Sequence, residues 1–398
     1  MKKHFDVIVA GAGIVGLGSA LKLLEKNSGL KLLIIEKENG VSKHQTGNNS
    51  GVIHSGIYYK PGSLKAVNCT RGYRMLLDFC DANEIQYDIC GKLIVATNEQ
   101  EIPALMNLYE RGEENGLTGL KIIETGRLKN FEPNVSGVKA IHVPQTGIID
   151  YKIVSKKIHE LLTRKGAEFV FNERIDYINE KTDSVEIGTD KEFYDAKLLL
   201  TCCGLQSDRI ARLNNKNLGL RIIPFRGEYY KIKKEKSSLI RNLIYPVPDP
   251  QFPFLGVHYT RKMNGEIEAG PNAVFAFGRE CYGKFDVNPK DLAESLVWKG
   301  FLSVAGRFWK TGLMEFYRSF SKPAFTRALQ KLTPCITEHD LEPGGAGIRA
   351  QACGKDGKLI DDFLFVENKR VLHVCNAPSP AATSCFSIGE TIATKLLS

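Results

Sequence analysis

A strand, a glycine-rich turn and a helix near the start of the chain constrain its fold more than any other feature. Residues 5–10 form a short apolar run that is typical of a strand buried on both faces, and residues 14–25 change to helical spacing. Between the two lie Gly11, Gly13 and Gly16, in the spacing G-x-G-x-x-G. In that spacing the first glycine allows a sharp turn, the second lets the backbone approach a pyrophosphate, and the third lets the helix pack on the strand.

An acidic residue follows this turn at the distance that a dinucleotide-binding fold requires. A second apolar strand is expected at residues 30–35, and Glu36 follows Gly16 by 20 residues. A carboxylate at that point accepts hydrogen bonds from ribose hydroxyls, while the pyrophosphate lies at the helix N-terminus, where N–H groups and the helix dipole favour anions. The pattern therefore predicts a dinucleotide site; the alternative is a glycine-rich turn in some other α/β protein.

A second formal match to the glycine spacing, at residues 345–350, lacks this context. The preceding residues, 338–344, are polar and include Pro343, so no apolar strand leads into the match. We expect a loop that enters a strand there. One dinucleotide site suits a tightly held flavin better than a flavin with a nicotinamide partner.

Length and charge narrow the class of protein. A chain of 398 residues allows two domains, because single cores stop growing near ~250–300 residues. The net charge of +9 is compatible with nucleic acid, an anionic membrane surface or an anionic small substrate. No nucleic-acid-binding motif accompanies it and the lysines are scattered, so nucleic acid is not expected as a partner.

The cysteines and the apolar runs predict a location. The ten cysteines show no C-x-x-C or Cys/His metal spacing, and most stand among apolar neighbours, which predicts no metal site and a reducing compartment. The first strand leaves no room for a signal peptide, and no apolar run approaches the ~18 residues of a membrane span. We expect a cytoplasmic protein, or one that is peripheral on the cytoplasmic face of the inner membrane.

The predicted elements give an α/β chain, α+β overall, with two discontinuous domains. A helix at 151–165 followed by a strand at 167–171 indicates a return to the first sheet, whereas alternation from residue 220 onward indicates an antiparallel sheet. A helical segment at 289–332 begins with Asn288 as its cap. We assign a Rossmann-like dinucleotide-binding domain to residues 1–89, 145–219 and 345–398, and a substrate domain to residues 90–144 and 220–344.

Six further blocks of sequence, in this order, resemble one family. They are residues 45–59, 224–229, 254–261, 269–273, 347–351 and 376–384. With these blocks the chain resembles the FAD-dependent oxidoreductases of the D-amino-acid-oxidase-like superfamily, and more narrowly the L-2-hydroxyglutarate dehydrogenase/oxidase family. That family usually has Ala-x-Gly where this chain has Cys202-Cys203-Gly204, a small-for-small change that leaves the flavin assignment intact.

The expected cofactor is FAD, and several segments are expected to contact it. Residues 44–62 are rich in Gly, Asn and Ser, so their backbone can lie against a flat ligand while His54 and its tyrosine neighbours face the reactive end. Beyond Gly11, Gly13, Gly16 and Glu36, we predict FAD contacts from Asn49, Ser50, Gly51, Gly204, Pro378, Ser379 and Ala381.

The resemblance implies oxidation of a 2-hydroxy acid, which needs a hydride acceptor, a base for the hydroxyl proton and a cation for the carboxylate. Arg349 is our prediction for the carboxylate, because a guanidinium binds it through two parallel hydrogen bonds; a structural arginine is the alternative. His258 and His54 are the candidate bases, and His258 is favoured because it lies in the substrate domain. Each is alternatively a structural histidine. Further predicted contacts are Tyr59, Arg226, Tyr229 and Arg261.

The helical segment carries aromatic and basic side chains together, notably between residues 299 and 331. Such a mixture suits the interface of an anionic membrane, where a flavoenzyme can pass electrons to a quinone; a helical cap on the sheet is the alternative. The predicted function is oxidation of L-2-hydroxyglutarate to 2-oxoglutarate, with electrons passed to a quinone or oxygen. Its rivals are a superfamily enzyme acting on an amino acid or glycerol 3-phosphate, and a non-enzymatic flavin-binding partner protein.

Overall fold

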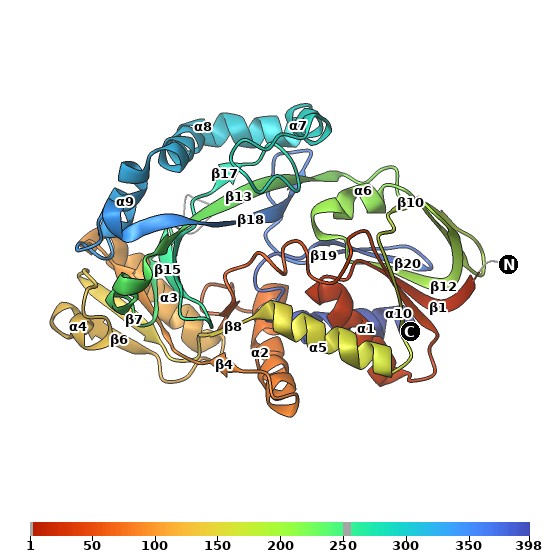
Figure 1. Cartoon of the computed structure of the whole chain (residues 1–398), viewed down its shortest axis with the longest axis horizontal. Coiled ribbons are helices and arrows are strands. Elements are labelled where there is room, and N and C mark those ends of the chain that lie inside the picture. Colours follow the sequence, from red (N-terminus) through yellow and green to blue (C-terminus); the bar gives the residue numbers. More distant parts are fainter. Residues whose placement is uncertain (1–2, 250–255) are drawn as a thin grey trace.

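The computed structural model describes residues 3–249 and 256–398 (Figure 1). The first of its three sheets has a parallel core with the strand order β9-β2-β1-β12-β20. Strands β10 and β11 extend this sheet as an antiparallel pair beside β12, and β19 pairs antiparallel with β20. The strands are β1 (Lys3–Ala10), β2 (Leu32–Glu36), β9 (Glu168–Phe171), β10 (Ile175–Glu180), β11 (Val185–Thr189), β12 (Phe193–Thr201), β19 (Leu364–Glu367) and β20 (Val371–Asn376).

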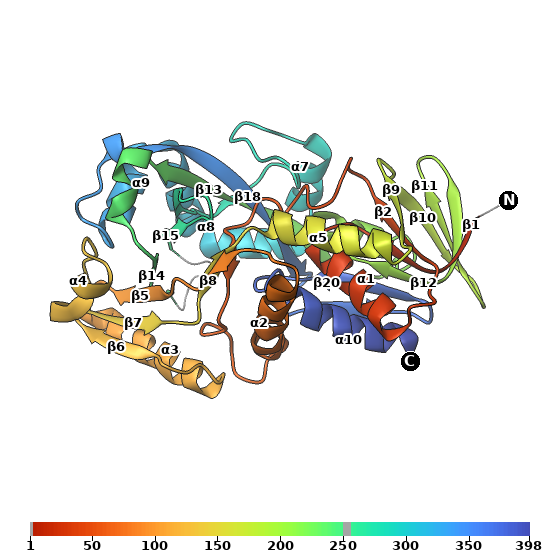
Figure 2. The ribbon, with the colours of Figure 1, turned by 60° about the horizontal axis from the view of Figure 1, so that its bottom comes forward.

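Helices from distant parts of the chain cover one face of this sheet together (Figure 2). Buried apolar side chains of β1 and β2 pack there against α1, α5 and α10 in one core. Helices α1 and α10 approach so closely that a Cβ added to Gly389 would lie 2.7 Å from the Gly18 carbonyl oxygen. The helices of this region are α1 (Ile14–Lys26), α2 (Leu64–Ala82), α5 (Tyr151–Arg164), α6 (Ser207–Ala211) and α10 (Cys385–Leu397).

The second sheet has the order β17-β13-β16-β15-β14-β5-β7-β6, and the long strand β18 pairs with β13 along nearly its whole length. In Figure 1 the β13–β18 pair reaches from this sheet toward the first one. The strands are β5 (Lys92–Ala96), β6 (Lys121–Glu124), β7 (Lys139–Val143), β13 (Leu220–Ile232), β14 (Leu243–Pro246), β15 (His258–Arg261), β16 (Ile267–Gly270), β17 (Val274–Phe275) and β18 (Leu341–Gly354).

A small third sheet has the strand order β3-β8-β4, with both pairs antiparallel. Helices α7, α8 and α9 follow one another along the edge of the molecule outside β13, β17 and β18 (Figure 1). The remaining strands and α-helices are β3 (Val52–Ile53), β4 (Tyr87–Asp88), β8 (Gly147–Ile149), α3 (Ile102–Glu114), α4 (Leu128–Phe131), α7 (Pro289–Leu296), α8 (Lys299–Phe320) and α9 (Lys322–Gln330).

The predicted mixed α/β fold with a parallel and an antiparallel sheet is confirmed, but one local prediction was wrong. Residues 345–350 lie inside strand β18 rather than in a loop before it, because cross-strand pairing with β13 holds them extended. The segment expected to be helical, 289–332, is helical over most of its length and divides into three helices. Within the alternating region expected from residue 220 onward, residues 250–255 lie outside the described residues.

The predicted domain boundaries stay a prediction, and the pairing of β18 bears on one of them. Residues 345–354 pair with β13 in the second sheet, whereas β20 pairs with β12 in the first. We therefore propose that the last boundary follows Gly354 instead of preceding residue 345.

Candidate active site

The three glycines of the turn have different reasons for lacking a side chain. Gly11 has a positive φ of 100°, and a Cβ there would lie 2.6 Å from the carbonyl oxygen of Cys202. A Cβ on Gly16 would lie 2.1 Å from the Gly11 carbonyl oxygen. At Gly13 the nearest atom is Thr46 Oγ1 at 3.5 Å, so the fold itself leaves room for a side chain. That open space at a helix N-terminus fits a pyrophosphate.

The beginning of α1 offers further groups that suit a dinucleotide. Gly13 is the N-cap and provides no side-chain cap, although the Ile14 N–H donates to Thr46 Oγ1 at 3.1 Å. Glu36 ends β2 beside the turn, and its Oε2 accepts a hydrogen bond of 2.8 Å from the Ala12 N–H. Each carboxylate oxygen can accept more than one hydrogen bond, so Glu36 keeps acceptor capacity for a ribose. The residues present therefore fit FAD.

The other predicted cofactor residues lie in residues 44–62, in the loop 376–384 that contacts them, and in the turn at Gly204. Residues 44–62 contact the loop 376–384, where Ser379 Oγ lies 3.1 Å from His54 Nε2 and 3.3 Å from the Tyr59 hydroxyl. The His54 N–H also donates to Thr383 Oγ1 at 3.0 Å, a contact that the sequence did not predict.

Backbone geometry fixes the remaining predicted residues. The Gly51 N–H donates to Asn49 Oδ1 at 2.8 Å, next to the half-buried Ser50, and Gly51 itself has a φ of 72°. The Ala381 N–H donates to the Pro378 carbonyl at 2.9 Å. Gly204 follows β12 with a φ of 47°, and β12 runs beside β1, which leads into the glycine turn.

His258 stands at the beginning of β15 in a defined orientation. Its Nδ1 lies 2.8 Å from the Gly256 carbonyl oxygen, which accepts only, so Nδ1 carries the proton and Nε2 keeps its lone pair. The Tyr245 ring stacks on the imidazole with centroids 3.9 Å apart. Burial, with smaller contributions from the charges of Arg349 and Lys92, lowers the pKa of His258 to about 3, so the ring is neutral near pH 7.

Lys92 is a member of this site that the sequence analysis missed. It begins β5 and is 1% exposed, and its Nζ lies 4.6 Å and 4.7 Å from the ring centroids of Tyr58 and Tyr245. Desolvation lowers its pKa to about 7. The only signal in the sequence was a lysine at the start of an apolar strand, residues 92–96.

Besides Lys92, Arg349 is a second cationic side chain whose charge acts on His258. It lies on β18 opposite Phe225, and desolvation lowers its pKa while Tyr229 and Tyr245 act in the opposite direction. His54 also belongs here, because desolvation and then the charges of Lys92 and His258 lower its pKa to about 3. We call His54, Lys92, His258 and Arg349 the polar cluster.

Two other arginines expected near the substrate are engaged elsewhere. Arg226 is 2% exposed, and its Nε and Nη2 donate to Glu228 Oε1 at 3.0 and 2.8 Å. Arg261 pairs with Asp88. Carboxylates of the protein, Glu228 and Asp88, thus already pair with both guanidinium groups, which disfavours the two arginines as substrate contacts.

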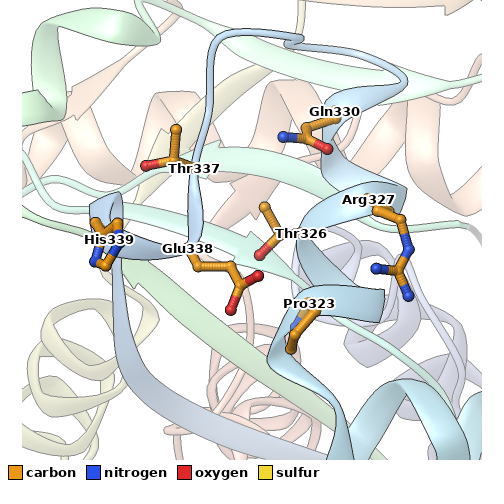
Figure 3. Close-up of a pocket in the computed structure, with 7 residues that line it drawn as sticks. All are labelled: Pro323, Thr326, Arg327, Gln330, Thr337, Glu338 and His339. Carbon is orange, nitrogen blue, oxygen red and sulfur yellow. The ribbon is translucent and has the colours of Figure 1, made fainter.

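Two pockets on the surface are separate from these residues. The first, of about 350 Å³, lies between α9 and the turn at 337–339, and Figure 3 shows the Arg327 and His339 side chains at its rim. The second, of about 420 Å³, is lined by residues 80–81, 84–87 and 263. Neither includes a residue of the glycine turn or of the polar cluster.

One group of possible metal ligands is also accounted for. Ligand atoms of Glu38, His44 and Glu280 lie within 4.8 Å of one another. The Lys37 ammonium lies among them, 3.0 Å from His44 Nε2 and 3.0 Å from Glu280 Oε2, and it also pairs with Glu38. A protein cation therefore already neutralises this group.

Comparison with known proteins agrees with this geometry. The chain matches the FAD dependent oxidoreductase (DAO) family over residues 6–395. It is 54% identical over 389 residues to the L-2-hydroxyglutarate dehydrogenase of Indibacter alkaliphilus, covering 98% of both chains. It is 42% identical to that of Escherichia coli K12, covering 98% of this chain and 93% of the other, and 43% identical to the human mitochondrial protein, covering 98% and 88%.

Solved structures show the same fold at low sequence identity. The L-alpha-glycerophosphate oxidase of Mycoplasma pneumoniae superposes with a TM-score of 0.80 at 20% identity, covering 99% of this chain and 95% of the other. The glycine oxidase of Geobacillus kaustophilus gives a TM-score of 0.73 at 14% identity, with coverages of 99% and 95%. The chain therefore belongs to the DAO family of FAD-dependent oxidoreductases and, within it, to the L-2-hydroxyglutarate dehydrogenases.

Proposed function

We propose that this protein is an FAD-dependent dehydrogenase that oxidises L-2-hydroxyglutarate to 2-oxoglutarate. The observation that carries the proposal is its 54% identity, over 98% of both chains, to a dehydrogenase named for that substrate. The open space at Gly13 and the acceptor Glu36 support FAD as the cofactor. Bound FAD supplies the acceptor for the hydride that leaves C2.

Arg349 and His258 have complementary roles in this proposal. Arg349 binds the carboxylate at C1 through its guanidinium fork and fixes the orientation of C2. His258 Nε2 accepts the proton of the C2 hydroxyl as the C2–H and O–H bonds break and the carbonyl forms. His54 and Tyr59, tied to Ser379, hold the loop 376–384 against residues 44–62.

Substrate binding makes His258 a better base than it is in the free protein. Burial is the main reason for its low pKa, and the positive charges of Arg349 and Lys92 lower the pKa further. The carboxylate that binds Arg349 neutralises the positive charge of its guanidinium, so the contribution of Arg349 to the lowering is removed when the substrate binds. The proton of the hydroxyl therefore moves to a ring whose basicity has risen.

Anaerobic addition of L-2-hydroxyglutarate is expected to bleach the flavin absorbance of the purified protein. The D enantiomer is the matched control, because it presents the same charges with the hydrogen on the wrong face of C2. Bleaching by an amino acid or by glycerol 3-phosphate instead would assign the protein to one of the rival reactions. No bleaching by any of these acids would support a non-enzymatic flavin-binding protein.

We also propose that the α7–α9 region docks the enzyme on an anionic membrane, where electrons pass to a quinone. Six apolar side chains of α8 are each more than half exposed, which is unusual for one helix. They form what we call the apolar helical face: Leu302, Trp309, Leu313, Met314, Tyr317 and Phe320. The opposite side of α8 packs on the sheet through Phe301 and Val304.

Basic residues accompany this face, although fewer than the sequence suggested. Arg318 pairs with Glu315, and Lys322 Nζ donates to the Leu341 carbonyl. Groups of the protein therefore already bind both basic side chains, which do not add to the charge available for lipid. The exposed basic residues of the region are Lys290, Lys299, Arg307, Lys310, Arg327 and Lys331. Each contributes about 1 kcal/mol near an anionic surface. Among the described helices, none has the length and apolar composition needed to cross a bilayer.

Co-sedimentation with vesicles of phosphatidylglycerol and phosphatidylcholine tests the docking. The protein is expected to sediment at low salt, and binding should weaken but persist as salt rises, because salt screens only the charges. Replacing Trp309 and Leu313 with serine should reduce binding at every salt concentration. The control replaces Val67 and Ile153, two apolar residues about as exposed on other helices, and should bind like the parent.

If the parent protein stays in the supernatant at low salt, the docking proposal is wrong. The helices are then only a cap on the sheet, and oxygen or a soluble carrier becomes the acceptor. The reaction itself is unaffected by this outcome, because flavin bleaching by the substrate requires no acceptor beyond the flavin.

A further inference from the structure

Lys92 is a buried lysine at a place where its charged form is costly. It lies on a strand between β14 and β7, pairing with Leu243 and Val143, and its side chain is among the largest that are fully buried. Within residues 3–249 and 256–398 its Nζ has no carboxylate partner and no hydrogen bond; its contacts are the faces of Tyr58 and Tyr245. Buried charges in proteins are normally paired, so this one calls for a ligand.

A second polar group beside Lys92 also lacks a partner. The Tyr58 hydroxyl is buried and, among the described residues, makes no hydrogen bond. The Tyr58 ring is the one that lies 4.6 Å from Lys92 Nζ. An ammonium and a hydroxyl that are both unsatisfied within the protein provide donors for an anion that enters the site.

The strand order places Lys92 and Arg349 on opposite sides of His258. His258 is on β15, with β14 and then β5 on one side and β16, β13 and then β18 on the other. Tyr245 of β14 lies near all three side chains. Its ring contacts Lys92 Nζ and stacks on His258, and the charge of Arg349 acts to lower the pKa of its hydroxyl. Two cations thus flank the base that acts on the central carbon.

We propose that Lys92 binds the distal carboxylate of the substrate, so that Lys92 and Arg349 together select a dicarboxylic 2-hydroxy acid over a monocarboxylic one. This inference rests on the proposed function and adds a specificity-determining residue to it. The distal carboxylate provides the counterion for Lys92 that the described residues of the protein do not provide. Carboxylates of the protein pair with Arg226 and Arg261, the two other arginines that the sequence predicted as substrate contacts.

The protonation of Lys92 gives the proposal a second readout. The neighbouring groups are neutral around pH 8: burial raises the pKa values of Tyr58, Cys69, Cys90 and Tyr245 and lowers those of His54 and His258. Lys92, with a pKa of about 7, is largely neutral there as well. A carboxylate beside it favours the ammonium, so binding of a dicarboxylate at pH 8 takes up close to one proton.

The first experiment compares L-2-hydroxyglutarate with its 5-amide, which has the same size but no distal charge. Lys92→Met is expected to lower kcat/KM for flavin reduction by L-2-hydroxyglutarate at least tenfold and to change that for the 5-amide less than threefold. Arg349→Lys should lower both. Lys65→Met is the matched control, because Lys65 lies near His54 but already pairs with Asp361 at 2.6 Å, and it should alter neither substrate.

The second experiment measures binding of glutarate, a dicarboxylate without the reacting hydroxyl, to the FAD-loaded protein by calorimetry at pH 8 in two buffers of different ionisation enthalpy. The parent should take up about one proton, and Lys92→Met should bind more weakly with no uptake. The proposal is overturned if Lys92→Met lowers kcat/KM equally for L-2-hydroxyglutarate and its 5-amide. It is also overturned if proton uptake in Lys92→Met is the same as in the parent. Proton uptake on glutarate binding is measured without turnover. Failure of the proposed reaction is therefore recognised separately, because in that case neither hydroxy acid would bleach the flavin of the parent protein.

Discussion

A Gly13→Val variant is expected to fold normally and to carry no FAD. The structure accepts a side chain at this position, because the N-cap backbone is extended (φ −76°, ψ 171°) and the nearest atom to an added Cβ is 3.5 Å away. The valine methyl groups would instead fill the space at the α1 N-terminus that the pyrophosphate needs. The purified variant should be colourless, with circular dichroism like that of the parent stripped of FAD.

Two other glycines serve as controls for this result. Gly16→Ala brings a Cβ to 2.1 Å from the Gly11 carbonyl oxygen, so it should reduce folding yield and thermal stability as well as flavin content. Gly219→Val should keep its FAD, because nothing lies within 4 Å of the added Cβ. A yellow Gly13→Val protein with full FAD content would show that the pyrophosphate does not lie at this turn.

A His258→Ala variant is expected to retain FAD and to be reduced by L-2-hydroxyglutarate about 10²–10⁴ times more slowly than the parent. The variant loses the Nε2 lone pair that accepts the hydroxyl proton but keeps Arg349 and Lys92, so substrate binding should change less than the reduction rate. Stopped-flow measurement of flavin reduction separates the two, because the rate at saturating substrate reports the chemical step.

Two further histidines distinguish this role from a general effect of histidine removal. His54→Ala should also alter the flavin spectrum, because His54 bonds to Ser379 and Thr383 in the loop expected beside the cofactor. His159→Ala, on α5, removes another histidine whose pKa burial lowers, and should leave the reduction rate unchanged. If only the His54 variant loses the reductive step, the base is His54.

Local patterns predicted the β1–α1–β2 unit of the first sheet well because the signals of this unit are contiguous in sequence. The apolar run of β1, the glycine turn and the spacing of Glu36 are all contained in the first 36 residues, and each has one dominant structural solution. Strand β18 was harder to predict. Its residues 342–347 are polar or small, and only pairing with β13, more than a hundred residues earlier, keeps them extended.

The cations of the site show where sequence reasoning stops. Arg226, Arg261 and Arg349 all lie in blocks that resemble one family, and nothing local separates them. Glu228 and Asp88 turn out to hold the first two, which only tertiary structure reveals. Lys92 was overlooked for the opposite reason, because burial of a lysine is a property of the packed sheet and a lysine at a strand end is ordinarily solvated.

The order in which the first sheet is assembled bears on how the protein matures in the cell. The strand beside β12 and the helix packed on α1 come from residues 371–397, so a nascent chain carries the glycine turn long before its supports exist. Ribosomal synthesis is vectorial, and incomplete domains expose apolar surface that chaperones recognise. We therefore expect flavin insertion to be post-translational, and nascent chains stalled before residue 371 to be bound by chaperones and to lack FAD.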